Sequence, residues 1–135
     1  EKQLNIKKFD TLKASIEDDI KKGEVINGIN FITHIDVDMD SLRKAVDLIK
    51  EKSISNTIVA SSTGANLKNQ IFFVIGVTQD LCDKGIDASK LIKDIAGDLG
   101  GSGGGRKDFA QAGGNKPEDF QKVLQKLKDM IKNII

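Results

Sequence analysis

A glycine-rich stretch near the end of the chain carries the residues whose chemistry is most readily named. Residues 100–114 read GGSGGGRKDFAQAGG. Glycine has no Cβ, so another molecule can reach the backbone N–H groups of such a run, and successive N–H groups can bind an anion. Arg106 can pair with a phosphate through two hydrogen bonds, Lys107 supplies a point charge, and Gln111 offers a donor and an acceptor to a base edge or a 2′-OH. The candidate site residues are Gly100, Gly101, Gly103, Gly104, Gly105, Arg106, Lys107 and Gln111.

Composition and spacing leave three interpretations of this stretch open. A run rich in glycine and serine is typical of a flexible surface loop or linker. A second interpretation is the nucleotide-phosphate loop of an enzyme. The spacing fits neither G-x-x-x-x-G-K-S/T nor strand-G-x-G-x-x-G-helix, because a predicted helix precedes the glycines. The third interpretation is a backbone cradle for RNA.

The overall composition narrows the class of function. The chain has the length of one domain, 135 residues, and its 21 basic and 20 acidic residues leave a net charge of only +1. Nucleic-acid binding must therefore come from local clustering of charge. Cys82 and His34 are the only residues of their types. They exclude an intrachain disulfide and an ordinary zinc site of Cys and His ligands, and they disfavour Ser-His-Asp or Cys-His catalysis.

Further absences bear on partners and location. The chain has no Trp or Tyr and only six Phe, so aromatic platforms for stacked bases are scarce. No apolar run approaches the roughly 20 residues of a membrane-spanning helix, so we expect no membrane partner. The chain begins with Glu1 and has no signal-peptide pattern. We therefore expect a piece of a longer cytoplasmic protein.

Local patterns predict the elements that must position the glycine-rich stretch. An apolar stripe of Phe9, Leu12, Ile16 and Ile20 predicts a helix over residues 4–22. Asp38 or Asp40 caps the second predicted helix, Asp87 begins the third, and Pro117 opens the last. Strands are expected at 25–35, 57–61, 71–77 and 109–112, with Gly28 marking a bulge or a turn inside the first of them. The glycines at 100–105 are expected to form a loop. The order predicts a single layered α/β domain, with a mixed sheet of about four to five strands packed with helices and preceded by an N-terminal helix.

The stretch at residues 100–114 resembles a signature, GGxGGGRxDxAQAGG, found near the C-terminus of alanyl-tRNA synthetases. Twelve positions match it, while Ser102, Lys107 and Phe109 stand at positions where the family often has other residues. Residues 38–43 and 77–92 also resemble the family, so the resemblance covers essentially the whole chain. Lys107 is the less secure site residue, because the family often has Pro there.

This resemblance implies a non-catalytic module rather than an enzyme. It implies that residues 1–22 are the end of a connecting helix and that residues 23–135 are the globular C-terminal domain. In the family this domain contacts the elbow of tRNA and couples aminoacylation with editing. The resemblance thus implies tRNA and the other domains of the parent synthetase as partners. The ATP, magnesium and zinc of the parent would be held elsewhere, so no cofactor is expected in this chain.

Two rival functions are kept. The chain resembles the substrate-binding domain that accompanies DHH-type phosphodiesterases, but those proteins show a GGGH-type motif and Arg106 stands here at the His position. A self-association module, dimerising through the first or the last helix, is the other rival. Four lysines decorate the last predicted helix, and we expect a solvated face or an extension of an RNA footprint: Lys122, Lys126, Lys128 and Lys132.

Overall fold

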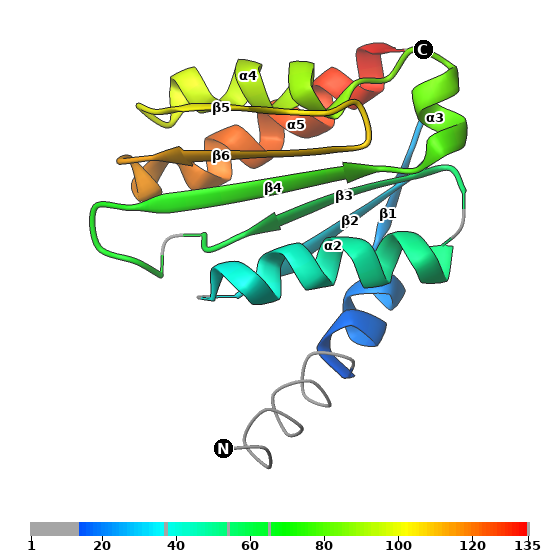
Figure 1. The fold of residues 1–135 in the computed structure, drawn as a ribbon, viewed down its shortest axis with the longest axis horizontal. Helices are drawn as coiled ribbons and strands as arrows, with labels where there is room; N and C mark the ends of the chain where they lie inside the picture. Colours follow the sequence, from blue (N-terminus) through cyan, green and yellow to red (C-terminus); the bar gives the residue numbers. More distant parts are fainter. Residues whose placement is uncertain (1–13, 37, 54, 65, 135) are drawn as a thin grey trace.

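The structure of the chain is a computed structural model that describes residues 14–36, 38–53, 55–64 and 66–134 (Figure 1). Residues 14–21 are helical. The elements that follow are β1 (Glu24–Ile26), β2 (Ile29–Ile35), α2 (Met39–Ser53), β3 (Thr57–Ser62), β4 (Ile71–Val77), α3 (Gln79–Asp83), α4 (Ala88–Asp98), β5 (Ser102–Gly105), β6 (Phe109–Gly114), the 3-10 turn Pro117–Asp119, and α5 (Phe120–Ile134).

One mixed sheet runs through the domain in the order β1-β2-β3-β4-β6-β5. Strands β2 and β3 are parallel because α2 connects them as a crossover, and the other neighbours are antiparallel. The α/β class and the mixed sheet are confirmed, but the sheet has six strands rather than four to five.

The two additional strands have different causes. Residues 25–35 form a hairpin, so Gly28 marks a turn rather than a bulge, and Asn27 and Gly28 both have positive φ, at 51° and 81°. Asn-Gly with this geometry is the preferred two-residue turn of a β-hairpin. The other addition is β5, which the sequence predicted as a loop.

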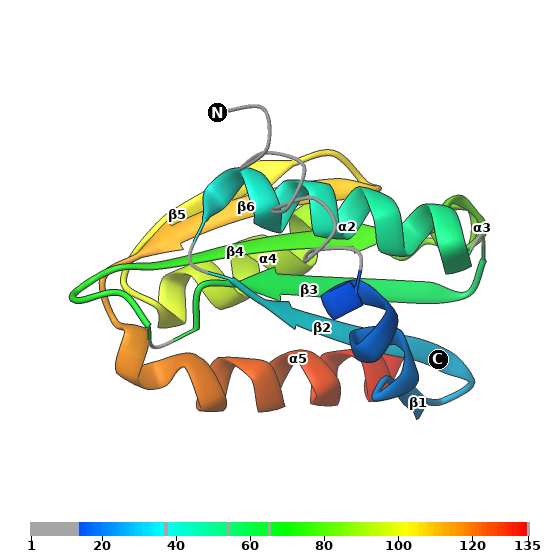
Figure 2. The same ribbon diagram turned by 90° about the horizontal axis from the view of Figure 1, so that it is seen from below.

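Helices cover the sheet on both faces, as Figures 1 and 2 show from two directions. Helix α2 and residues 14–21 lie on one face, where Ile16, Val46 and Val74 belong to one buried cluster. Helices α4 and α5 lie on the other face, over a larger cluster that includes Phe73 and Phe120. Helix α2 packs mainly on β3 and β4, whereas α4 packs on β5 and β6. Among the described residues, the glycine-rich strands β5 and β6 therefore have a helix packed on one face only.

The described part of the N-terminal helix is attached to the domain. Ile16 is buried, as its apolar stripe predicts, while Phe9 and Leu12 lie outside the described residues. Asp19 Oδ2 lies 2.5 Å from Nδ1 of buried His34, and Lys52 pairs with Glu17 at 3.2 Å. These contacts fix residues 14–21 on the α2 face of the sheet.

The predicted helix starts agree with the structure. Asp38 accepts from Ser41 Oγ at 3.0 Å at the start of α2, and Asp87 accepts from the Ser89 N–H at 2.9 Å at the start of α4. Pro117 opens a 3-10 turn that leads into α5. The short helix α3 was not predicted, since five residues carry too little periodicity to reveal it.

Candidate functional site

The glycine-rich stretch folds into a β-hairpin at one edge of the sheet. Gly100 and Gly101 connect α4 to β5, and the remaining candidate glycines lie within β5. The expected loop is therefore wrong for residues 102–105. Glycine is a poor strand former, so the sequence alone favours a loop. Pairing with β6 and the packing of α4 override that preference.

The α4 side of the hairpin has no room for side chains. A Cβ built on Gly103 would lie 2.5 Å from Ala112 Cβ and 2.6 Å from the Gln111 carbonyl oxygen. One built on Gly101 would meet the Gly113 carbonyl, and one on Gly114 would meet Leu99. The fold itself therefore requires glycine on this side.

The opposite side of β5 is different at Gly104. Its φ is not positive, and a Cβ built there would have no atom within 4 Å. Neither backbone conformation nor packing against the described residues requires glycine at this position. Gly104 pairs with Gln111, which is exposed, so the two residues share an open part of the sheet.

The hairpin also presents backbone groups along the edge of the sheet. Arg106 donates its N–H to the Phe109 carbonyl at 2.8 Å, which closes the turn as a hydrogen-bonded pair. Hydrogen-bonded and non-bonded pairs alternate along an antiparallel ladder. Gly103 and Gly105 therefore direct their N–H and C=O groups away from β6, toward the outer edge. No side chain of either residue shields these groups.

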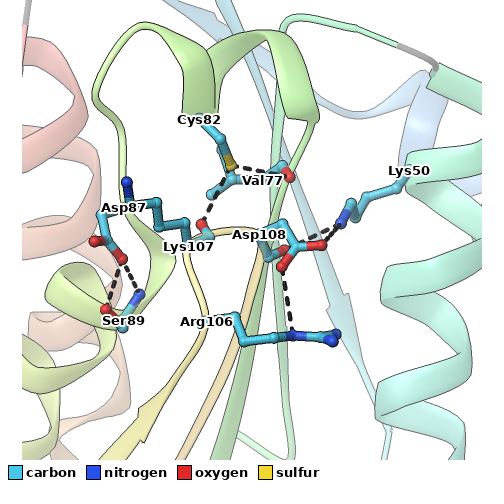
Figure 3. A network of polar contacts seen from close by, with 8 residues as sticks. All are labelled: Lys50, Val77, Cys82, Asp87, Ser89, Arg106, Lys107 and Asp108. Carbon is cyan, nitrogen blue, oxygen red and sulfur yellow. Dashed lines mark hydrogen bonds and ion pairs between the residues drawn. The ribbon is translucent and has the colours of Figure 1, made fainter.

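The turn at residues 106–108 is anchored by three other elements (Figure 3). The Lys107 carbonyl accepts from the Ala88 N–H at the start of α4, at 2.8 Å. The Asp108 carbonyl accepts from the Val77 N–H at 3.0 Å and from Lys50 Nζ at 3.1 Å. A turn held by α2, α4 and β4 presents its side chains in a fixed orientation.

Arg106 is exposed and oriented by an acid. Its Nε lies 3.6 Å from Asp108 Oδ1, and Lys50 Nζ lies 3.7 Å from the other carboxylate oxygen. The Arg106 side chain is 77% exposed, so its guanidinium remains accessible to a ligand. Lys107 is also exposed, but Figure 3 shows its side chain leaving the turn on the side away from Arg106. The structure thus does not place Arg106 and Lys107 on one face.

Two basic residues of α2 reach the hairpin, and the sequence analysis missed both. Arg43 donates from Nε to Gln111 Oε1 at 3.1 Å, and Lys50 holds Asp108. They are seven residues apart, so they lie on one side of α2. This seven-residue spacing could have shown from the sequence that the two basic residues share one side of the helix. It does not reveal which distant element their side chains contact.

Two titrating groups next to the turn have structural roles. Burial raises the pKa of the Cys82 thiol, whose Sγ donates to the Lys107 carbonyl at 3.4 Å. The side-chain hydrogen bond from Ser89 lowers the pKa of Asp87, which caps α4. Cys82 is therefore a buried, protonated packing residue, in agreement with the small and buried character of most free cysteines.

The lysines of α5 present a contrast with the hairpin. Lys126 pairs with Asp98 at 2.6 Å, and Lys128 pairs with Glu24 at 3.0 Å. Two of the four lysines thus have their charge neutralised by an acid of a neighbouring element. This arrangement favours a solvated structural face over an extension of the candidate site.

Residues 14–134, apart from the positions not described, contain no group of three or more His, Cys, Asp or Glu side chains that could hold a metal ion. Within these ranges, no helix has the length and apolarity needed to cross a membrane.

Comparisons with known proteins agree on one family. The DHHA1 domain family matches residues 24–133. The alanine–tRNA ligase of Alkaliphilus oremlandii is 36% identical over 98% of this chain, and the match spans 15% of that protein's length. The C-Ala domain of Aquifex aeolicus alanyl-tRNA synthetase superposes with a TM-score of 0.72 at 27% identity, covering 82% of this chain and 98% of that domain.

A more distant structure shares the fold alone. A DHH-domain member of the s1p family of ribosomal proteins superposes with a TM-score of 0.69 at 18% identity, covering 94% of this chain and 31% of that protein. The present chain therefore corresponds to about one seventh of the curated ligases it matches and to nearly all of the C-Ala domain.

Proposed function

This chain belongs to the DHHA1 domain family, and from that membership we propose that it is the tRNA-binding C-terminal domain of an alanine–tRNA ligase. It acts by contacting the tRNA elbow and so holds one tRNA for both aminoacylation and editing. Similarity to the C-Ala domain supports this proposal over nearly the full length of that domain. The chain itself carries out no reaction. Its partners are tRNA and the other domains of a cytoplasmic ligase, where ATP, magnesium and zinc would act.

The observation that carries the proposal is the outer side of the β5–β6 hairpin. Unshielded amides of Gly103 and Gly105 lie along the sheet edge, and the exposed Arg106 stands where β5 ends. Backbone N–H groups and an arginine are common partners of phosphate oxygens. Because Gly104 has no side chain, nothing projects from β5 over the adjoining part of the sheet, although the fold does not require glycine there.

The chemistry favours the surface of a folded RNA over a flexible single strand. The chain has no Trp or Tyr for base stacking, whereas a rigid strand edge can follow a backbone of fixed shape. We infer that affinity comes from phosphate contacts and that selectivity comes from the shape of the RNA corner. Because elbow geometry is shared among tRNAs, the isolated domain is expected to discriminate poorly between them.

A charge reversal at the hairpin tests the proposal. Arg106→Glu is expected to weaken tRNA binding by about thirtyfold or more, since a hydrogen bond to a charged group contributes about 2 kcal/mol and 1.4 kcal/mol is tenfold. A mobility-shift titration at several salt concentrations measures the affinity. For the unmodified chain the logarithm of the binding constant should fall linearly with the logarithm of salt concentration.

A matched reversal separates the site from general charge. Lys93 is an exposed residue of α4, which lies on the other face of the sheet from α2, so Lys93→Glu makes the same charge reversal away from that face. It should leave binding within about threefold of the unmodified chain, because exposed charges are screened over about 10 Å at 0.1 M salt. Equal effects of the two variants would remove Arg106 from the site.

The two rival functions have different standing. The phosphodiesterase rival is supported only by a shared fold with proteins less than 20% identical, and Arg106 occupies the position of the expected His. Self-association through the first or last helix stays a prediction. Light scattering at micromolar concentration checks it, and a monomer would count against it.

A further inference from the structure

Both arginines of the chain converge on the hairpin. Among 21 basic residues, 19 are lysines, and the two arginines are Arg43 and Arg106. Arg106 follows β5, whereas Arg43 belongs to α2 and reaches β6 through its 3.1 Å bond to Gln111. Arginine differs from lysine in its rigid, planar donor fork, which fits phosphate and stays charged.

We propose that Arg43 is a second RNA-contacting residue and that it fixes Gln111 as a hydrogen-bond donor toward the RNA. This inference rests on the proposed tRNA-binding function and extends the site from the strand edge onto the sheet face beside α2. The ligand chemistry at this point is a phosphate for Arg43 and an acceptor atom for Gln111. The acceptor is a base carbonyl, a ring nitrogen or a ribose 2′-oxygen.

The direction of Gln111 follows from donor and acceptor chemistry. A guanidinium has donors and no acceptor, so Arg43 Nε–H must face the carbonyl oxygen of the Gln111 amide. The Gln111 NH₂ group is then the free end of the side chain. Within the described residues it bonds to no acceptor, so two N–H donors remain for a ligand.

Within the described residues, the surface beside Gln111 is open at Gly104. Gly104 pairs with Gln111 across the ladder, and a Cβ at Gly104 would point into open space. A larger side chain at that position would stand directly beside the Gln111 amide. The absence of a side chain there thus serves access to Gln111 rather than the packing of the domain.

Arg43 can exchange its present ion pair for a phosphate at low cost. Its side chain is 45% exposed, and Nη1 lies 4.0 Å from Asp40 Oδ1, at the limit of an ion pair. Exposed pairs of this kind contribute little to stability. A phosphate would accept from the terminal nitrogens through short, charge-assisted bonds while Nε keeps its bond to Gln111.

Arg43→Met in the full 135-residue chain tests the proposal. Mobility shifts with tRNA should show about tenfold weaker binding. The slope of the logarithm of the binding constant against the logarithm of salt concentration should fall by the amount expected for about one phosphate contact. The matched control is Lys44→Met, which removes the same charge from the same helix about 100° further round its axis. Lys44 is exposed, and its loss should change affinity by less than about threefold.

The outcomes distinguish this inference from the function on which it rests. If Arg106→Glu weakens binding while Arg43→Met and Lys44→Met behave alike, the inference about Arg43 is wrong and the function stands. If none of the three changes affects binding, neither arginine belongs to the site, whereas a failure of the unmodified chain to bind tRNA would overturn the proposed function itself.

A double-variant cycle tests the coupling between the two side chains. Gln111→Met removes the amide N–H donor. The double variant with Arg43→Met should bind tRNA about as tightly as the single variant of lower affinity. Residues in direct contact show such non-additivity. If the fold-losses in affinity of the two single variants multiply in the double variant, Arg43 does not act through Gln111. Thermal melts of all variants confirm that folding is retained, since both side chains are exposed.

Discussion

The two sides of the β5–β6 hairpin use glycine for different reasons. On the side that faces α4, Gly103 lies so close to β6 that a Cβ would lie 2.5 Å from Ala112 Cβ. On the other side, Gly104 has open space in front of it. The first glycine is required by folding, and we propose that the second leaves room for a ligand. A run of one residue type can therefore carry two requirements that only the three-dimensional arrangement separates.

The largest expected effect comes from adding one carbon on the α4 side. Gly103→Ala should destabilise the domain by about 2–3 kcal/mol, because an overpacked site must shift backbone. The corresponding fall in Tm is roughly 10 °C for a chain of this size. Calorimetry or a thermal melt followed by circular dichroism measures it. A variant as stable as the unmodified chain would contradict the tight packing of this side.

A bulky residue on the open side should weaken tRNA binding without destabilising the domain. Gly104→Leu is expected to leave folding intact or stabilise it by about 0.5 kcal/mol, since replacing glycine restricts the unfolded chain. Binding to tRNA should fall about fivefold, because the side chain would stand between the RNA and Gln111, and a neutral hydrogen bond contributes about 1 kcal/mol. Paired melts and mobility shifts check both parts. Unchanged binding would leave the glycine at this position without an explanation.

The smallest expected effect concerns the cap that holds the α4 side in place. Asp87 caps α4, and the next residue, Ala88, anchors the Lys107 carbonyl. The folded-state pKa of Asp87 is lowered, so its stabilisation is fully present above the unfolded pKa of about 3.9 and is lost as pH falls through the lower folded value. Asp87→Ala should cost about 1 kcal/mol at pH 7.

Urea titrations at two pH values measure that dependence. The stability gap between the Asp87→Ala variant and the unmodified chain should narrow between pH 7 and pH 3, as the carboxylate is protonated. A gap that stays constant over this range would contradict a role for the charged form of Asp87. Affinity for tRNA at pH 7 should change little, since Asp87 touches the turn only through its neighbour Ala88.

Local patterns predicted much of the fold, and the miss at β5 has a long-range cause. Asp87, Pro117 and the apolar stripe through Ile16 are local signals, and the structure bears them out. The strand at residues 102–105 was missed because glycine propensity argues for a loop. Only pairing with β6 and the cover of α4, both long-range effects, produce a strand there.

The candidate site was predictable only in part for the same reason. The hairpin residues Arg106 and Gln111 are adjacent to the glycines in sequence, so the stretch itself points to them. Arg43 and Lys50 lie in a helix that comes before β3 and β4, and their meeting with the hairpin depends on strand order. One sequence does not reveal which side of α2 faces a glycine-rich edge strand.

Nuclease protection of tRNA by the 135-residue chain tests the central claim most directly. The account predicts that nucleotides at the corner of the L, where the D and T loops meet, become protected as the protein is titrated. The protection should require Arg106 and be unaffected by Lys93→Glu. Full cleavage of that corner at saturating protein, with protection elsewhere or nowhere, would contradict the account.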